Sequence, residues 1–168
     1  LFESFGFIVE RNTSKKKDVL KGWDLSMTQE NLTFLIEVKN DILASTTGNL
    51  AIEYMNSRTN KPSGLMSTTA DFWVYVLDKE IWLTSTQSLK EYLQYYTPFK
   101  IIDKAGDGNA SLFIYKKENI LGISGPFIRI DNKNKEEINN IVKLYDIFER
   151  NEEIKEEYMI VDVEDFHS

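Results

Sequence analysis

The sequence predicts an α/β protein, with one compact domain over residues 1–130 and an acidic, mainly helical extension over residues 131–168 packed on or beside it. The chain of 168 residues is 42% hydrophobic and 12% aromatic, which is enough to fill a single core. Short apolar runs bounded by turn residues recur through the first 130 residues, a pattern typical of β-hairpins. The extension instead repeats apolar residues at helical spacing.

The N-terminal part predicts a helix end followed by a β-hairpin. Leu1 to Phe5 has the pattern of a helix end closed by Gly6. The expected strands after it are Phe7–Val9, Val19–Thr28 and Leu32–Lys39, with a lysine-rich loop after the first and a turn at residues 29–31 between the other two. The last strand is apolar on both faces until it ends in charged residues, which suits a central buried strand.

The middle of the chain predicts further hairpins and one helix. Leu50 to Tyr54 is apolar but fits a strand and a helix equally well. The expected strand pairs are Phe72–Leu77 with Ile81–Thr84 across Asp78-Lys79, and Lys100–Ile102 with Leu112–Lys116 around Gly106 to Asn109, followed by a last strand at Phe127–Ile130. Thr86 is expected to cap a helix that runs to about Tyr96 and stops before Pro98.

The tail predicts an amphipathic helix from Lys133 to about Glu157. Its apolar face would be formed by Ile138, Ile141, Val142, Tyr145 and Phe148. Trp73, Tyr75 and Trp82 lie within apolar strands, and they are expected in the core and not as base-stacking platforms.

Composition excludes several function classes. The chain has no cysteine, and its one histidine is His167, so disulfides, thiolate zinc sites and histidine-centred hydrolysis are not available. Carboxylate, lysine, tyrosine and hydroxyl chemistry remains. Neither a membrane-spanning run nor an export signal is apparent, so a cytoplasmic address is expected, in the host cytoplasm if the chain is of phage or viral origin.

The net charge of −7 is concentrated in the tail, because residues 131–168 hold 12 acidic and 5 basic residues and residues 1–130 hold 15 of each. A neutral body can carry a local basic face for nucleic acid. Its candidate members are Lys15, Lys16, Lys17 and Lys21, with Arg58, Lys61 and Ser63 in a later polar loop. A solvated lysine loop and a plain flexible loop are the alternatives.

Asp24, Glu37 and Lys39 form the candidate catalytic group. Strand side chains alternate, so Glu37 and Lys39 project from one face about 6.6 Å apart. If the hairpin places Asp24 beside them, the carboxylates of Asp24 and Glu37 and the backbone carbonyl of Val38 offer the oxygen ligands that Mg²⁺ prefers, with Mn²⁺ as a substitute. A divalent metal and a lysine together can activate water and stabilise charge on a phosphodiester.

Asp24, twelve intervening residues and Glu37-Val38-Lys39 resemble the PD-(D/E)XK, or restriction-endonuclease-like, nuclease superfamily. Here Gly22-Trp23-Asp24 replaces the usual Pro-Asp. Residues 47–54, 61–64 and 68–73 are also similar to small phage and viral members. The resemblance implies a core with a central mixed sheet flanked by helices, Mg²⁺ dependence, and catalysis shared by Asp24, Glu37 and Lys39.

Three other carboxylates are weaker candidates. Glu3 stands where many members of the superfamily carry an acidic residue on the first helix, and Glu53 could be a further metal ligand or a solvent-facing strand residue. Asp71 could belong to the site or serve as a capping or turn residue. A surface ion-pair network is the alternative for the whole Asp24, Glu37 and Lys39 group.

Two functions follow from these features. The first is a Mg²⁺-dependent endonuclease acting on DNA, working as a homodimer if both strands are to be cut. The second is a non-catalytic module whose acidic tail, from Glu136 to Asp165, imitates nucleic acid or engages a basic protein.

Overall fold

The computed structural model describes residues 1–13, 22–131 and 135–145. By its internal contacts the chain divides into two units, Leu1–Ile130 and Asp131–Ser168. The first unit is a mixed α/β structure with two β-sheets. Within the second unit the described residues form the helix α4 (Lys135–Tyr145), and the rest of the predicted tail helix lies outside the described residues.

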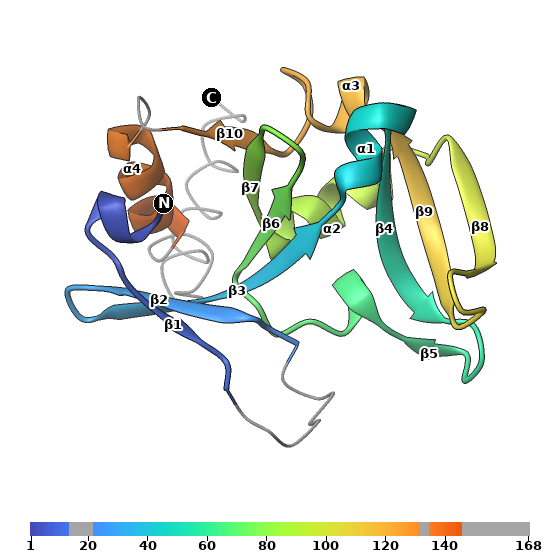
Figure 1. The fold of residues 1–168 in the computed structure, drawn as a ribbon, viewed down its shortest axis with the longest axis horizontal. Coiled ribbons are helices and arrows are strands. Elements are labelled where there is room, and N and C mark those ends of the chain that lie inside the picture. The colour runs from blue at the N-terminus through green and yellow to red at the C-terminus, as the bar shows by residue number, and fades with distance from the viewer. Residues whose placement is uncertain (14–21, 132–134, 146–168) are drawn as a thin grey trace, which may run out of the picture. The chain divides into compact units, whose positions relative to one another are not determined.

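The first sheet is mixed, and among the described residues it has six strands in the order β1-β2-β3-β6-β7-β10 (Figure 1). Their bounds are Ile8–Arg11, Leu25–Gln29, Leu32–Asn40, Phe72–Val76, Ile81–Ser85 and Ile128–Ile130. Among the described strands only β3 and β6 pair in parallel, with Ile36 opposite Phe72 and Asn40 opposite Val76. A parallel pair needs a long crossover, and here the chain forms α1 and two strands of the second sheet, β4 and β5, before it returns.

The hairpin that was predicted to carry the site is confirmed. β2 and β3 are antiparallel, with Leu25 opposite Ile36 and Gln29 opposite Leu32. Glu30 adopts a positive φ of 55° in the turn. Residues 19–21 of the predicted first arm lie outside the described residues, and the observed arm begins at Leu25. The turn at Asp78-Lys79 between β6 and β7 is confirmed as well.

The second sheet is antiparallel, and in the described part of the chain its strands follow the order β5-β4-β9-β8. Their bounds are Lys61–Pro62, Asn49–Asn56, Ala110–Lys116 and Lys100–Ala105. The segment 50–54 is therefore a strand, which settles the alternative left open by its sequence. The short helix α1 (Ile42–Thr47) connects the end of β3 to the start of β4 (Figure 1), and Asp41 caps it by accepting the Ala44 N–H at 3.1 Å.

The helix α2 (Thr86–Tyr95) begins one residue earlier than its predicted cap implies. Ser85 is the N-cap, since its hydroxyl accepts the Ser88 N–H at 3.0 Å, and Thr86 is already helical. The expectation that Thr86 caps the helix is therefore wrong. The Thr86 hydroxyl instead donates to the Ala70 carbonyl at 2.7 Å, which ties the helix to the loop before β6.

Replacing Ser85 by alanine should lower the free energy of unfolding by about 1 kcal/mol, because the cap of α2 is lost. Urea denaturation measures this loss. Ser88→Ala is the matched control, since it removes the 2.9 Å hydroxyl contact to Ser85 but leaves the backbone N–H that the cap satisfies. Equal losses in the two variants would show that the hydroxyl pair, and not the cap, stabilises this end of α2.

The buried core of the first unit joins both sheets. It includes Trp73 and Tyr75 of β6, Leu50 and Ile52 of β4 and Leu89 of α2, all buried. Trp73 and Tyr75 were predicted core residues and are confirmed, while Trp82 is partly buried against the same cluster. The resemblance implied a sheet flanked by helices, and here the core on one face of the first sheet includes helix residues such as Leu89 of α2 together with Leu50 and Ile52 of the second sheet.

This core fixes the direction of the candidate catalytic side chains. In the parallel ladder Glu37 is opposite Trp73 and Lys39 is opposite Tyr75. Partners in register project from the same face of a sheet. Glu37 and Lys39 therefore extend from the face that carries the core, at the point where β3 ends. None of the described helices is long and apolar enough to span a membrane.

Candidate active site

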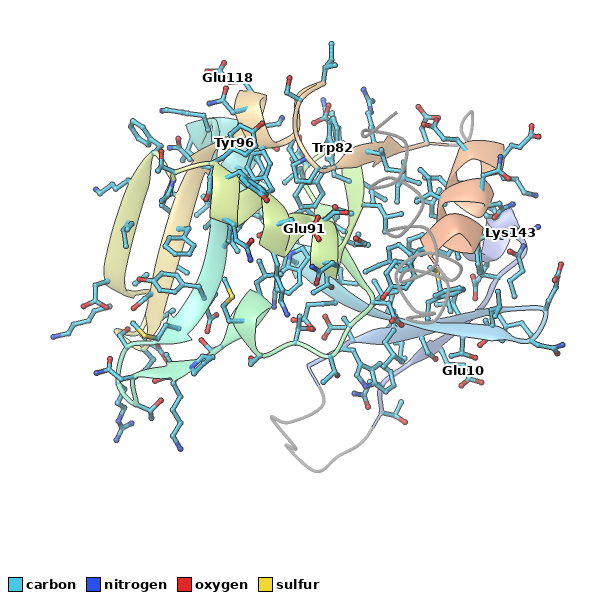
Figure 2. The ribbon with its side chains drawn as sticks, turned by 180° about the vertical axis from the view of Figure 1, so that it is seen from behind. Glu10, Trp82, Glu91, Tyr96, Glu118 and Lys143 are labelled. Atoms are coloured by element: carbon cyan, nitrogen blue, oxygen red, sulfur yellow. The ribbon has the colours of Figure 1, made fainter. Side chains whose placement is uncertain are left out.

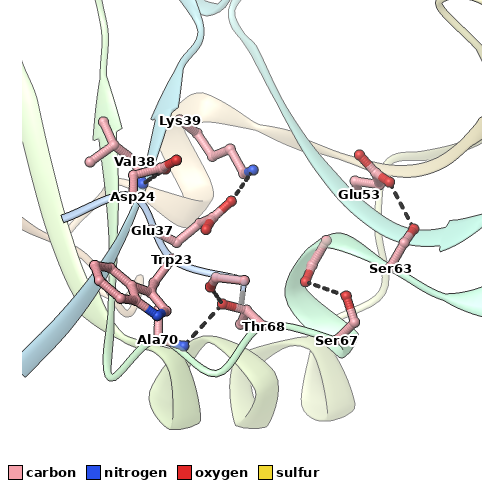
Figure 3. A network of polar contacts seen from close by, with 12 residues as sticks. Trp23, Asp24, Glu37, Val38, Lys39, Glu53, Ser63, Ser67, Thr68 and Ala70 are labelled. Carbon is pink, nitrogen blue, oxygen red and sulfur yellow. Dashed lines mark hydrogen bonds and ion pairs between the residues drawn. The ribbon is translucent and has the colours of Figure 1, made fainter. Parts of the chain in front are cut away.

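Asp24 is bonded to β3 on both sides of Glu37 (Figure 3). Its backbone N–H donates to the Ile36 carbonyl at 2.8 Å. Its carboxylate Oδ2 accepts the Val38 N–H, also at 2.8 Å. The hairpin therefore brings Asp24 beside Glu37, as its sequence position predicted, and a backbone donor fixes the direction of the Asp24 carboxylate.

Lys39 is paired with Glu37 two residues earlier on the same strand. The Lys39 ammonium donates to Glu37 Oε1, and the two side chains are 34% and 13% exposed. The same ammonium lies 5.1 Å from the centroid of the buried Trp73 ring, within the range of a cation–π interaction. A carboxylate and an indole face thus hold the lysine head group.

Tyr75, the register partner of Lys39, has a structural role. Its phenol donates to the Ala51 carbonyl at 2.7 Å and joins β6 to β4. Burial raises the pKa of Tyr75 above its usual range, so the phenol stays protonated and is not a candidate base.

Two groups outside the hairpin hold Asp24 in place. Asn12 donates its backbone N–H to the Asp24 carbonyl at 2.8 Å and its side-chain amide to the Trp23 carbonyl at 3.1 Å. Thr68 donates its hydroxyl to the Gly22 carbonyl. A Cβ on Gly22 would lie 2.8 Å from the Thr68 Cα, so only glycine allows this approach. The Thr68 contact could not be predicted from spacing, because Thr68 is 46 residues from Gly22.

Glu53 is oriented by Ser63. The Ser63 hydroxyl donates to Glu53 Oε1 at 2.7 Å, and both residues are shown with Asp24, Glu37 and Lys39 in Figure 3. The short 3₁₀ helix η2 (Gly64–Met66) lies directly on β4, where a Cβ on Gly64 would be 2.3 Å from the Glu53 carbonyl oxygen. Ser63 was a candidate for phosphate contact; its hydroxyl donates to the Glu53 carboxylate, and a contact with phosphate stays a prediction.

Glu3 lies away from Asp24 in the hairpin. It belongs to the 3₁₀ turn η1 (Glu3–Phe5), which precedes β1, and the adjacent Gly6 is next to the Gln29 side chain. Asp24 is at the other end of β2, five residues away, or roughly 16 Å at the rise of a strand. The structure therefore does not bring Glu3 to the candidate catalytic group.

Asp71 supports the sheet. Its carboxylate accepts the Leu35 N–H at 2.7 Å and its backbone N–H donates to the Leu35 carbonyl at 2.8 Å. These bonds continue the pairing of β3 with β6 by one residue on each strand, to Leu35 and Asp71.

The expected basic face is only partly described. Arg58 and Lys61 are exposed at the hairpin between β4 and β5, where Asn56 Oδ1 accepts the N–H groups of Arg58 at 3.1 Å and Thr59 at 3.0 Å. Lys15, Lys16, Lys17 and Lys21 lie outside the described residues. Their contact with nucleic acid remains a prediction.

The donor set fits a magnesium ion that keeps several water ligands. Within the described residues, no three Asp, Glu or His side chains lie close enough together to hold a metal, so neither Glu3 nor Glu53 completes a cluster with Asp24 and Glu37. Mg²⁺ is commonly held by one or two carboxylates, with water and substrate phosphate completing its shell. Asp24, Glu37 and the Val38 carbonyl suit this mode, while a closed cage made of protein ligands alone would need more donors.

No protein-family model matches the chain, and no curated protein does. A solved structure that matches is the bacterial homing endonuclease I-Ssp6803I, with 17% identity and a TM-score of 0.40. The matched region covers 54% of this chain and 62% of that one, so the chain spans less than two thirds of that protein. At this similarity, no residue role or activity can be transferred.

Proposed function

We propose that this chain is a metal-dependent endonuclease of the PD-(D/E)XK type that hydrolyses DNA phosphodiesters. The observation that carries the proposal is the bonding of Asp24 to the residues on either side of Glu37, with Lys39 paired to Glu37 at the same strand end. An ordinary surface ion pair does not require a third charged side chain fixed by a backbone donor. Glu37 and Lys39 also project from the core-bearing face of the sheet.

The charges of the group suit a phosphodiester substrate. Asp24, Glu37 and Lys39 together carry a net charge of −1. Asp24 and Glu37 would hold Mg²⁺ or Mn²⁺, and a bound dication changes the net charge of the group to +1, which attracts a singly charged phosphodiester. The metal supplies Lewis acidity and a lowered pKa for water.

The chain's own residues orient these charges. The Val38 N–H donates to one oxygen of the Asp24 carboxylate and so fixes the plane of that carboxylate. The second oxygen lies in the same plane, so its position is fixed as well. Glu37 and the Trp73 ring hold the Lys39 ammonium near the reacting centre, where it can orient the attacking water and stabilise negative charge on the phosphoryl oxygens. Arg58, Lys61 and the lysines at positions 15, 16, 17 and 21 would hold the DNA backbone. A homodimer would place two such sites on a duplex.

Incubation of purified protein with supercoiled plasmid DNA tests the proposal. Nicked or linear product is expected with Mg²⁺ or Mn²⁺ and should disappear when EDTA is added. Branched, single-stranded and RNA substrates should be included, since base readout depends on loops and not on the catalytic group. An absence of cleavage of every substrate with either metal, with the Asp24→Asn variant behaving like the original protein, would contradict the proposal and favour the non-catalytic module.

A further inference from the structure

An aromatic cavity of about 860 Å³ lies at the C-terminal end of α2. It is formed by that end of α2, the segment leading to β8, the end of β9 and the short helix α3 (Lys117–Ile120) with the turn after it. We call it the tyrosine pocket, since its lining includes Tyr92, Tyr95, Tyr96 and Tyr115. Figure 2 labels two of its residues, Tyr96 and Glu118, close together at this end of the second sheet.

Ring contacts hold the inner wall of the tyrosine pocket. The rings of Tyr92 and Tyr96 are stacked with centroids 4.4 Å apart, and Tyr115 meets Tyr92 edge-on at 5.7 Å. The Tyr115 phenol donates to the Tyr96 carbonyl at 2.8 Å. Burial raises the pKa of Tyr115 to about 12, so this donor is retained at neutral pH. The wall is thus preformed.

The outer wall presents aromatic rings that the fold leaves open. Tyr95 is 81% exposed and Phe99 is 62% exposed, although both line the cavity. Covering the face of a large aromatic ring removes much apolar surface from water, which is favourable in free energy. Two open rings at one cavity point to a ligand with flat faces.

A cation lies against one of these rings. The Lys116 ammonium is 3.9 Å from the Phe99 ring centroid. Among the described residues it forms no ion pair, and Glu118, the carboxylate of the lining, is not within ion-pair distance of it. The Asn119 side chain adds an amide with both a donor and an acceptor. The lining therefore combines stacking faces, one available positive charge and polar groups suited to a base edge.

We propose that the tyrosine pocket binds a nucleobase next to a singly charged phosphodiester. The base would stack on the Tyr95 and Phe99 rings, as bases stack on exposed aromatics in proteins that bind single strands, and Lys116 would contact the phosphate. Glu118 and Lys116 carry opposite charges, so the lining has no net charge although the two do not pair. A pocket without net charge disfavours highly charged nucleoside triphosphates. A groove for a proline-rich peptide would also be aromatic, but it would not need the unpaired lysine.

This binding does not depend on the proposed nuclease activity, and it can be measured without cleavage. The Lys39→Ala protein in EDTA is titrated with a fluorescein-labelled ten-residue oligo(dT), with the dinucleotide TpT and ATP as competitors, and with a labelled proline-rich peptide in a parallel titration. Oligo(dT) should bind, TpT should compete and ATP should compete poorly. Competition by TpT would show that a free dinucleotide suffices, whereas its failure would assign the site to longer single strands.

Substitutions in the lining test whether oligo(dT) binds in the tyrosine pocket. Phe99→Ala and Tyr95→Ala should each weaken oligo(dT) binding about 10-fold, the effect of removing one stacking face. Lys116→Gln should lower the slope of log affinity against log salt by about one. Leu43→Ala is the matched control, because Leu43 is 71% exposed on α1 and does not line the cavity.

Three results would overturn the inference. They are an absence of oligo(dT) binding, equal affinity of the Phe99→Ala and Leu43→Ala proteins, and preferential binding of the proline-rich peptide. Circular dichroism spectra and melting curves that match those of the original protein exclude misfolding of the variants as a cause. Such a match is expected, because the substituted rings are exposed. An absence of plasmid cleavage by the original, unsubstituted protein, with oligo(dT) binding intact, would count against the nuclease proposal alone.

Discussion

Lys39→Ala is expected to lower the rate of Mg²⁺-dependent DNA cleavage by roughly 100- to 1,000-fold, the usual effect of removing one group that stabilises transition-state charge. The variant should remain folded. The Lys39 side chain is one-third exposed, and its ammonium contacts the Glu37 carboxylate and the Trp73 ring. Partly exposed ion pairs contribute at most about 1 kcal/mol, so the midpoint of urea denaturation should change little.

The affinity for Mg²⁺ separates the role of Lys39 from the roles of the two carboxylates. Removing Lys39 leaves a net charge of −2 on Asp24 and Glu37, so Mg²⁺ should bind at least as tightly as before while cleavage is lost. Asp24→Asn and Glu37→Gln should instead weaken Mg²⁺ binding together with cleavage. Isothermal titration with Mg²⁺, alongside the plasmid assay, measures both quantities for each variant.

Lys79→Ala is the matched control for Lys39→Ala. Lys79 is an exposed lysine in the turn between β6 and β7, so its replacement removes one positive charge without altering the catalytic group. Its cleavage rate should stay within a factor of about two of the original, because a single exposed charge contributes little to the binding of DNA. If Lys39→Ala retained the rate of Lys79→Ala, the lysine would belong to a structural ion pair and the catalytic assignment would fail.

The parts of the fold that were predictable from sequence are those determined by neighbouring residues. The hairpin of β2 and β3 follows from a short turn between two apolar runs, and its register then places Asp24 beside Glu37. The cap of α2 was missed by one residue because Thr84, Ser85 and Thr86 offer three successive hydroxyls, and only the backbone conformation selects among them.

The support of the site could not be predicted, because it depends on contacts between distant segments. Thr68 holds Gly22 across 46 residues, and Ser63 orients Glu53 across 10. No periodicity or spacing marks such pairs. The apolar run at residues 50–54 was ambiguous for a related reason, since its strand pairing is with β9, about sixty residues later in the chain. The placement of Asp24 beside Glu37 could thus be predicted from sequence, while the residues that hold Asp24 in place could not.

Gly64→Ala is expected to be among the most destabilising single substitutions near the site. Gly64 has a positive φ of 53°, a conformation that costs an alanine about 1–2 kcal/mol. The added Cβ would also lie 2.3 Å from the Glu53 carbonyl oxygen and 2.7 Å from the Glu53 Cβ, so η2 and β4 must separate. Forcing atoms into a packed contact adds about 1–3 kcal/mol. The total loss of unfolding free energy should therefore be roughly 2–5 kcal/mol.

Gly48→Ala separates the two contributions. Gly48 has a similar positive φ of 67°, but a Cβ there would meet no atom within 4 Å, so this variant should lose only the conformational cost of about 1–2 kcal/mol. Urea denaturation of both variants gives the difference, which measures the packing of Gly64 on Glu53. Equal losses would show that η2 can move off β4 at little cost.

Gly64→Ala and Gly48→Ala also test whether the packing of η2 on β4 affects the position of Asp24. The Gly64 carbonyl accepts the Thr68 N–H at 3.0 Å, and Thr68 holds the segment that carries Asp24 through the Gly22 carbonyl. Displacement of η2 should therefore reach Asp24, and Gly64→Ala should reduce cleavage well beyond Gly48→Ala under conditions in which both proteins are fully folded. If the two variants cleaved at the same rate, Asp24 would be held by the hairpin and Asn12 alone, and the contact between Gly22 and Thr68 would be dispensable for catalysis.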